Sequence, residues 1–362
     1  MIEVMQSEHV FMVIWFLSLV ALFAALAWIL SRVKIQIGTD VKASDMIDRW
    51  SKHARPTVGG IVFLIALIGW AVHYSIISDF SLSELVLLNC GILAFLLGLW
   101  DDLKRISASK KLIGQMVIAG IFAYFRFRTM DDAAETSSPA GAIQIVWFAI
   151  IFIVTVGMMN SVNMLDNMDG VSSIAAIPVL LIPVIAGYQG SVFSAIMLAS
   201  LLGFLFLNWP KSKIFMGDSG SMLLGFIISW LLFEHNGHLT FVGGIFNLLI
   251  VLVASCSLYL CDTLVVVINR LRHGVSPATG GRDHSTHNLV YFGLSEKQVA
   301  FLFLALSTVQ VFMLVVMHGL DASDAGQHNV IKMVFGYFFL LFVFFFSISV
   351  RNLMKGKYAY KK

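Results

Sequence analysis

Residues 84–111 read ELVLLNCGILAFLLGLWDDLKRISASKK, an apolar run that ends in two carboxylates followed by a basic segment. A helix needs roughly 20 mainly apolar residues to cross the hydrocarbon core of a bilayer, with about 17 at the lower end of the range. The run 84–100 meets that requirement, and the Lys and Arg residues after it are typical of a cytoplasmic segment. The stretch therefore predicts a membrane-spanning helix that carries Asp101 and Asp102 to the membrane surface.

The composition of the whole chain agrees with this interpretation. Of its 362 residues, 59% are hydrophobic and 12% are charged, whereas a typical soluble domain carries about 25% charged residues. The mild net charge of +3, without a basic tail, argues against a nucleic-acid-binding protein. Cys90, Cys256 and Cys261 lie in or beside apolar stretches and lack metal-ligand spacing, so we expect them to be buried thiols.

Eleven apolar segments are predicted to span the membrane. With an external N-terminus, 21 of the 24 Lys and Arg residues lie in segments on the cytoplasmic side, as the positive-inside rule requires. No Lys or Arg precedes the first segment, so we expect it to be retained rather than removed as a signal peptide. We therefore expect an all-α polytopic membrane protein, with one transmembrane catalytic domain over residues 1–362 and a cytoplasmic C-terminus. The expected spans lie near 9–30, 58–77, 84–100, 112–126, 142–159, 171–187, 191–207, 221–234, 243–268, 298–318 and 330–350, and the candidate active-site segments near 31–57, 101–111, 160–170, 208–220 and 269–297.

Polar residues recur at every third position in the segment 160–170, which reads NSVNMLDNMDG. They are Asn160, Asn163, Asp166 and Asp169, and on a helix this spacing gives one continuous polar stripe. Such a stripe at the end of an apolar span is costly unless it faces a cavity or partner groups. A helix cap would account for one of the four residues, so the segment favours a functional site.

Two further motifs lie in cytoplasmic segments. Residues 215–221 read FMGDSGS, in which Asp218 is a candidate either for a helix N-cap or for binding a cation that bridges phosphate oxygens. Residues 280–287 read GGRDHSTH, whose Arg and His side chains could hold a pyrophosphate or simply be exposed loop residues. A zinc site is disfavoured because His-x-x-His without cysteine lacks the usual four-ligand set.

Two further features, the stretch 55–60 and Asp262, also have ordinary structural explanations. The stretch RPTVGG at 55–60 is typical of a helix start. Asp262 lies within the ninth span, about two turns before Arg270, where an ion pair with that arginine is the simplest interpretation. Six carboxylates from four segments fall on the one side chosen from Lys and Arg alone, which indicates a shared site. They are Asp101, Asp102, Asp166, Asp169, Asp218 and Asp283.

These motifs, in this order, resemble those of the polyprenyl-phosphate N-acetylhexosamine-1-phosphate transferases. The resemblance extends from Arg55 to His287, and its most specific part is the stretch 160–170 followed by Phe-Met-Gly-Asp-Ser-Gly. It implies transfer of a HexNAc-1-phosphate, with GlcNAc-1-phosphate as the first candidate, from a UDP-sugar to undecaprenyl phosphate, releasing UMP. The product would be the first lipid-linked intermediate of a cell-surface polysaccharide such as the O-antigen of lipopolysaccharide. The enzyme would lie in the bacterial cytoplasmic (inner) membrane with its site facing the cytoplasm.

The resemblance also implies roles for single residues. Asp218 and Asn163 would hold Mg²⁺, with Mn²⁺ as a substitute. Asp101 and Asp102 would be catalytic carboxylates beside the lipid phosphate, and Asp166 is grouped with them. The other residues would bind the UDP-sugar: Asp169 and Phe215 the uracil, Lys111, Arg282, His284 and His287 the pyrophosphate and sugar, with Asn160 as a further binding residue.

The sequence departs from the family pattern at two positions. Family members often have His-x-His-His after Asp-Arg-x, whereas here Gly281 replaces the leading Asp and Thr286 the middle His. These departures concern the sugar more than the reaction. A lipid I synthase, which transfers phospho-MurNAc-pentapeptide, is the alternative, although the short loops offer no obvious place for a pentapeptide. A transporter or lipid flippase would instead need ionisable groups near the bilayer midplane, where Asp262 alone lies deep. The sugar, the pathway and a homodimer are left open.

Overall fold

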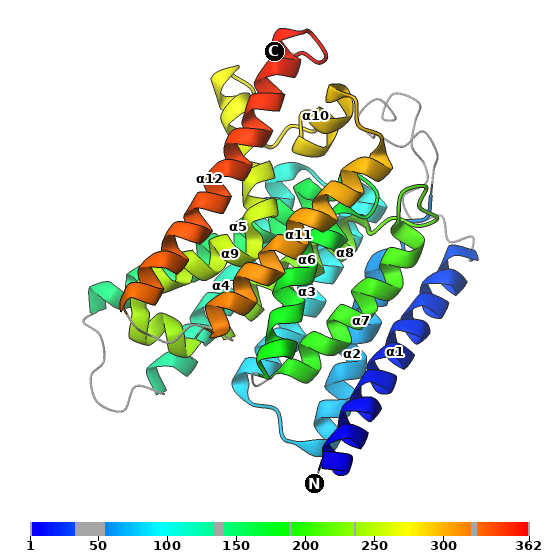
Figure 1. Cartoon of the computed structure of the whole chain (residues 1–362), viewed down its shortest axis with the longest axis vertical. Coiled ribbons are helices and arrows are strands. Elements are labelled where there is room, and N and C mark those ends of the chain that lie inside the picture. Colours follow the sequence, from blue (N-terminus) through cyan, green and yellow to red (C-terminus); the bar gives the residue numbers. More distant parts are fainter. Residues whose placement is uncertain are drawn as a thin grey trace.

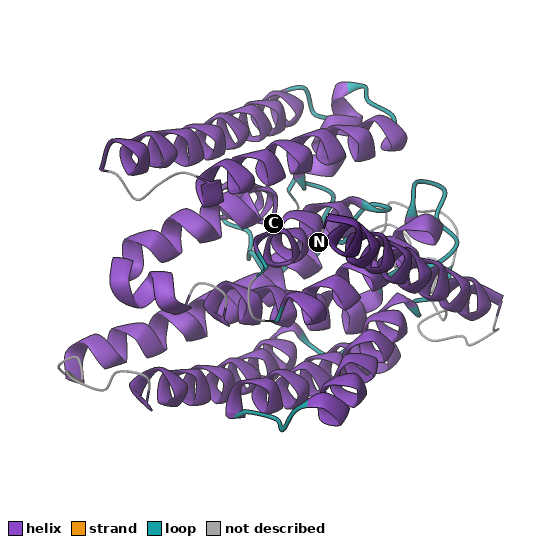
Figure 2. Cartoon of the chain, turned by 60° about the horizontal axis from the view of Figure 1, so that its bottom comes forward, coloured by secondary structure: helices purple, strands orange, loops and turns teal. Residues whose placement is uncertain are grey.

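The computed structural model describes residues 2–32, 55–132, 141–187, 190–234, 237–319 and 324–360. These residues form twelve α-helices and no strand (Figure 2). Eleven of the helices coincide with the eleven expected apolar segments, and the other, α10, lies in the segment 269–297 that we expected to be a loop. The helices are α1 (Ile2–Arg32), α2 (Gly59–Ile77), α3 (Leu82–Lys104), α4 (Ala108–Asp132), α5 (Gly141–Leu165), α6 (Val171–Ala186), α7 (Ser191–Asn208), α8 (Gly217–Glu234), α9 (Gly237–Arg272), α10 (Ser285–Phe292), α11 (Glu296–Gly319) and α12 (Asp324–Met354).

Eight of these helices are long and apolar enough to cross a membrane: α1, α2, α3, α5, α7, α9, α11 and α12. Helix α6 is apolar but shorter, and α4 and α8 carry polar residues at their ends. The chain is therefore a polytopic all-helical membrane protein. Its termini lie at opposite ends of the bundle (Figure 1). The external N-terminus stays a prediction, and most of the expected segment 31–57, namely 33–54, lies outside the described residues.

Helix α8 forms the centre of the bundle, packed against α2, α3 and α5. All of its residues from 219 to 233 are buried, as in a helix that is apolar on every side. Glycines let the neighbouring backbones come close to its first turn. A Cβ on Gly98 of α3 would lie 2.2 Å from the carbonyl oxygen of Asp218, and one on Gly60 of α2 would lie 2.5 Å from the amide nitrogen of Gly220.

The expected polar stripe over 160–169 is wrong in its second half. Helix α5 ends at Leu165, so Asn160 and Asn163 lie on the helix whereas Asp166 and Asp169 lie in the turns that lead to α6. The chain turns here because Gly170 adopts a left-handed conformation, with φ of +76°, which suits glycine. Its amide donates to Asn208 Oδ1 at 2.9 Å and so ties the turn to the end of α7.

Candidate active site

The polar segments at the ends of these helices meet in three neighbouring groups of side chains. Asn167, in the turn after α5, accepts a hydrogen bond on its Oδ1 from Thr286 Oγ1 and so joins that turn to α10. We name the groups the Lys111 cluster (Asp101, Lys111, Asn163, Asp218), the Asp169 cluster (Arg55, Asp169, Ser212, Phe215) and the His284 cluster (Asp262, Arg270, Asp283, His284).

In the Lys111 cluster, three oxygen atoms from three helices converge on one ammonium group. Lys111 Nζ lies 2.6 Å from Asp218 Oδ1 and 2.8 Å from Asp101 Oδ2. Asn163 Oδ1 is 3.2 Å from the same nitrogen, and its amide Nδ2 donates to Asp218 and to Ser221 Oγ. Burial opposes the charge on Lys111, but attraction to Asp218 and Asp101 outweighs it and raises the pKa of the ammonium group. Lys111 therefore stays charged at neutral pH.

A tight turn between α3 and α4 brings Asp101 and Lys111 together. Arg105 ends α3 in a left-handed conformation, with φ of +48°, and its amide donates to the Asp101 carbonyl oxygen at 2.8 Å. The amide of Ile106 donates to Asp101 Oδ1 at 3.0 Å, which leaves Oδ2 to face Lys111. One carboxylate oxygen of Asp101 therefore holds the turn, and the other contacts Lys111.

Asp102 has a different task from its neighbour. Its carboxylate is 9% exposed and accepts the amides of Asp218 and Ser219, each at 2.9 Å. These amides belong to the first turn of α8, where backbone donors lack partners within the helix. Asp102 therefore provides the cap that we considered for Asp218, and it fixes Asp218 relative to α3.

In the Asp169 cluster, the expected uracil-binding carboxylate is occupied by protein groups. Asp169 Oδ2 lies 3.2 Å from Arg55 Nη1 and accepts the Ser212 amide at 3.0 Å, while Oδ1 accepts Ser212 Oγ at 2.9 Å. The Arg55 guanidinium lies over the Phe215 ring, 5.4 Å from its centroid. The Phe215 amide donates to the Pro56 carbonyl oxygen at 2.9 Å, which ties Phe215 to the segment before α2. Arg55 thus joins the site, a role that the interpretation of 55–60 as a helix start missed.

Asn160 is bound within the bundle rather than directed at the three clusters. It exchanges two hydrogen bonds with Gln115 of α4, at 2.9 and 3.3 Å, and donates to the Val156 carbonyl. Gln115 is fully buried, and sequence reasoning missed it because a single amide in an apolar span carries no motif. Asp166 lies half-buried in the turn after α5, where its amide bonds to the Val162 carbonyl at 3.1 Å.

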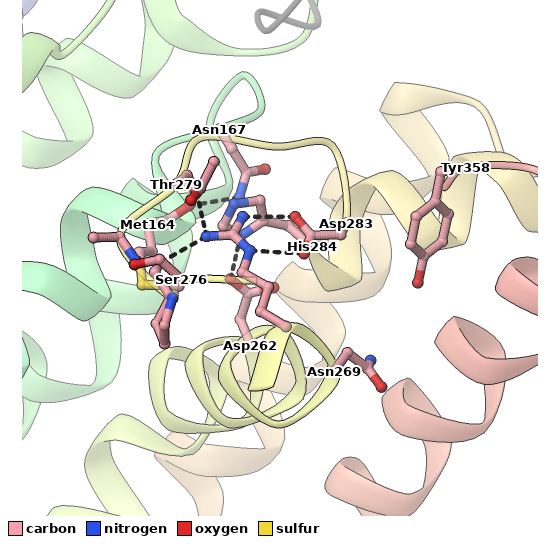
Figure 3. A network of polar contacts seen from close by, with 12 residues as sticks. Met164, Asn167, Asp262, Asn269, Ser276, Thr279, Asp283, His284 and Tyr358 are labelled. Atoms are coloured by element: carbon pink, nitrogen blue, oxygen red, sulfur yellow. Dashed lines mark hydrogen bonds and ion pairs between the residues drawn. The ribbon is translucent and has the colours of Figure 1, made fainter. Parts of the chain in front are cut away.

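The His284 cluster is built on α9 and the segment that follows it (Figure 3). The expected pair of Asp262 with Arg270 is wrong. Arg270 forms a bidentate ion pair with Asp283, at 2.8 and 2.6 Å, because the segment after α9 folds back over its last turn. Asp262 instead accepts His284 Nδ1 at 2.9 Å and the Ser285 amide at 2.7 Å.

The remaining predicted residues of this segment lie beside the cluster. Arg282 is half-buried, and His287 is buried in α10 with its ring 5.6 Å from that of His284. Burial, together with His284 and Arg282 nearby, lowers the pKa of His287 well below its usual value. His287 is therefore neutral at neutral pH, and the cationic side chains of 282–287 are Arg282 and, when protonated, His284.

The Lys111 cluster has a donor set that fits a divalent cation. Mg²⁺ is usually bound through one or two carboxylates, with water and substrate phosphates at the other positions. Asp101, Asp218 and the Asn163 amide oxygen provide such a partial set, and in this structure the Lys111 ammonium group holds the position between them that a cation would take. Over the described ranges, no three or more His, Cys, Asp or Glu side chains gather to hold a metal by themselves. The residues thus fit a cation that a substrate would help to coordinate.

The chain is similar in sequence to proteins of a known family. The profile of glycosyl transferase family 4 matches residues 84–236. A phospho-N-acetylmuramoyl-pentapeptide-transferase of Halalkalibacterium halodurans is 31% identical over 233 residues, which cover 59% of this chain and 71% of the relative. The chain belongs to glycosyl transferase family 4. A probable undecaprenyl-phosphate N-acetylglucosaminyl 1-phosphate transferase of Bacillus subtilis is 27% identical over 285 residues, 74% of either chain. A phospho-N-acetylmuramoyl-pentapeptide-transferase of Listeria monocytogenes is 33% identical over 211 residues, 53% of this chain and 65% of the relative.

The glycosyl transferase family 4 match includes the whole Lys111 cluster, together with Asp102 and Asp169. It excludes Arg55 and the segment that carries His284. The names of the relatives divide between two sugars, N-acetylglucosamine and N-acetylmuramoyl-pentapeptide. Family membership therefore makes the protein a transferase and leaves its sugar open.

Proposed function

We propose that the protein transfers an N-acetylhexosamine 1-phosphate from a UDP-sugar to undecaprenyl phosphate, releasing UMP. The observation that carries the proposal is the Lys111 cluster, where two carboxylates, an ammonium group and an amide converge at the ends of four helices, of which α3 and α5 are long and apolar enough to cross a membrane. A polyprenyl tail needs a site next to lipid, and a nucleotide sugar needs a site next to water. The end of a helical bundle at the membrane surface satisfies both requirements.

The acceptor phosphate needs positioning more than activation. A phosphate monoester has a second pKa of about 6, so it is largely dianionic at neutral pH and can attack directly. Lys111 would hold this phosphate through a charge-assisted hydrogen bond, and Asp101 would keep the ammonium group in place. The attack on the sugar-side phosphorus forms the new phosphate–oxygen bond and breaks the bond to UMP, which leaves with the electron pair.

Mg²⁺ is part of the proposal, with Asp218 and Asn163 as its principal ligands and Asp101 beside them. When bound, such a cation neutralises charge on the diphosphate oxygens and on the departing UMP. Asp102 supports Asp218 through the two amides of α8 that it accepts. Arg282 and His284 would contact the diphosphate, and His287 would contribute as a neutral side chain.

The nucleotide base is assigned to the Asp169 cluster. Phe215 is half-buried, so part of its ring is accessible for stacking on uracil. Asp169 fixes Arg55 over that ring, and its carboxylate is already engaged by Arg55 and Ser212. We therefore assign Asp169 chiefly to the position of Arg55 and Phe215, with direct contact to the base as the secondary role.

GlcNAc-1-phosphate is the first candidate for the transferred group, and phospho-MurNAc-pentapeptide is the second. The Bacillus subtilis relative favours the first and the Halalkalibacterium halodurans relative the second. Thr286, where the resembling family often has histidine, is fully buried and donates to Asn167, so its side chain serves the fold of the site. The product would start a cell-surface polysaccharide, with the site facing the cytoplasm of a bacterial cell.

A panel of UDP-sugars tests the proposal. Purified protein with Mg²⁺ and undecaprenyl phosphate is given UDP-GlcNAc, UDP-GalNAc or UDP-MurNAc-pentapeptide, and UMP is measured. We expect UMP with at least one donor, and none when the lipid is omitted. Release with UDP-MurNAc-pentapeptide alone would replace the first candidate by the second, and no release with any donor would contradict the proposed reaction.

A further inference from the structure

Asp262 is a carboxylate deep within an apolar helix. Its side chain is 1% exposed, and it lies in the stretch Leu248–Arg272 of α9, which is apolar enough to cross a membrane. A carboxylate in such surroundings is costly unless it is paired and hydrogen-bonded. Its two oxygens are used on the segment after α9: Oδ2 on His284 Nδ1, at 2.9 Å, and Oδ1 on the Ser285 amide, at 2.7 Å (Figure 3).

The backbone of this segment is also held by groups other than Asp262. Asn288 Nδ2 donates to the carbonyl oxygens of Asp283 and His284, at 2.9 and 3.0 Å. Arg270 holds the Asp283 carboxylate and also donates to the carbonyl of Pro277. The loop around His284 is thus fixed by several contacts, whereas the hydrogen bond that orients its ring is the one to Asp262.

The contact has a chemical consequence for the imidazole. A carboxylate accepts and cannot donate, so the Nδ1 atom that faces Asp262 must carry the hydrogen. Nε2 is then the atom that remains for a ligand. When the ring takes up a second proton, Nε2–H can donate to an anionic oxygen while Nδ1–H stays on Asp262.

We propose that Asp262 is a positioning residue that keeps a proton on Nδ1 of His284 and so directs Nε2 to a phosphate oxygen of the nucleotide sugar. This inference rests on the proposed function, because the phosphate belongs to the donor substrate assigned above. Carboxylates that orient metal-binding histidines contribute about 10- to 100-fold to metal affinity or activity, and we expect an effect of the same order for Asp262. Asp262 lies 22 residues before His284 in the sequence, so no motif indicates the pair.

The variant Asp262→Asn separates orientation from simple space filling. The amide oxygen can still accept the Ser285 amide, but the amide nitrogen now faces Nδ1 and forces the hydrogen onto Nε2. With ¹⁵N-labelled histidine, we expect Nδ1 of His284 to be protonated in the wild type and unprotonated in Asp262→Asn. The resonance is assigned by its loss in His284→Ala. An unprotonated Nδ1 in the wild-type protein would overturn the proposal, whether or not the protein is active.

Kinetics provide the second test. We expect Asp262→Asn to lower kcat/KM for the UDP-sugar by about 10- to 100-fold, and to have no further effect in a His284→Ala background. Ser257→Ala is the matched control, because Ser257 is buried in the same helix and donates to the carbonyl of Val253, within the helix itself. An equal loss in both backgrounds would assign Asp262 a structural role only. If the wild type forms no lipid product, the proposed function fails, and the NMR result still decides the state of His284.

Discussion

At the scale of single residues, the adjacent carboxylates of Asp101 and Asp102 have different partners and different roles. Asp101 directs one oxygen at Lys111, whereas Asp102 directs both of its oxygens at the amides that begin α8. Their chemistry is identical, and only the 100° rotation between neighbouring helix positions separates their partners. The pair therefore provides one residue for the reaction and one for the architecture.

This division predicts different outcomes for two isosteric variants. Asp101→Asn should lower activity by about 100-fold or more, since it removes a fixed charge beside the transferred phosphates, with little change in thermal stability. Asp102→Asn should lower the free energy of unfolding by about 1.5–3 kcal/mol, because a charged acceptor leaves two amides. Thermal unfolding in detergent and UMP release distinguish the two. Equal losses of stability would contradict the division.

Lys111 is the residue on which both carboxylates of the cluster depend. In Lys111→Met, Asp101 and Asp218 would face each other without the ammonium group between them. We expect activity to fall by about 100-fold or more, with partial recovery in Lys111→Arg, which restores the charge but not the compact geometry. The control is Lys110→Ala, since Lys110 is exposed on the same turn of α4. If Lys110→Ala lost as much activity as Lys111→Met, the effect would come from the general surface charge and not from the cluster.

Asp283 gives the site a dependence on pH that can be measured without substrate. Burial raises the pKa of Asp283, but its hydrogen bonds and attraction to Arg270 outweigh burial and hold that pKa below its usual value of 3.8. The folded protein therefore binds this proton more weakly than the unfolded chain. The stabilisation is complete above the unfolded value and is lost as the pH falls below 3.8, through the folded pKa.

We expect Asp283→Asn to be less stable than the wild type at pH 7 by about 3–5 kcal/mol, because it leaves Arg270 buried without its carboxylate partner. The difference in thermal midpoint should persist from pH 7 to pH 5 and shrink below the unfolded value of 3.8. A difference that grows on acidification would contradict the lowered pKa of Asp283.

Sequence motifs identified the residues of the Lys111 cluster, but they did not identify the partners of Asp102 and Arg270. Asp101, Lys111, Asn163 and Asp218 stand in motifs, and the structure brings all four together. The partners of Asp102 are backbone amides, which every residue has and no sequence pattern marks. Arg270 was expected to meet Asp262 because of their spacing on one helix, but the loop that supplies Asp283 decides the pairing.

At the scale of elements, the first turn of α8 depends on the close approach of its neighbours. Gly98→Ala would place a Cβ 2.2 Å from the Asp218 carbonyl oxygen and push α3 away from α8. We expect a loss of stability of about 1–3 kcal/mol from overpacking, and a loss of activity because Asp218 moves relative to Asp101. Gly120→Ala in α4 is the control, since a Cβ there meets nothing within 4 Å. An unchanged activity in Gly98→Ala would show that the register of α3 and α8 is not needed.

The helices were predictable because apolar composition alone identifies a membrane span. Helix α10 was missed, since its eight residues lie in a polar segment and are too few for a periodic pattern. The end of α5 was also missed. Polar residues at every third position favour a helix, but the left-handed Gly170 and the turns before it end the helix at Leu165.

At the scale of the whole molecule, the candidate site is assembled from helix ends and connecting segments that are far apart in the sequence. The ends of α3, α4, α5 and α8 contribute the Lys111 cluster. The segments before α2, between α5 and α6, and between α7 and α8 contribute the Asp169 cluster, and α9 with the segment before α10 contributes the His284 cluster. The sequence predicted this assembly from the distribution of Lys and Arg, which is independent of the carboxylates. The sugar could not be predicted, because it depends on the shape of a surface that several loops form together.

The most direct test of the proposed reaction follows the sugar-side phosphorus. A UDP-sugar labelled with ³²P at the β position is incubated with the purified protein, Mg²⁺ and undecaprenyl phosphate, and the lipid is extracted. Transfer of a sugar 1-phosphate moves the label into the lipid product and leaves UMP unlabelled. Label that stays in the aqueous phase as UDP while the sugar enters the lipid would show simple glycosyl transfer and contradict the account.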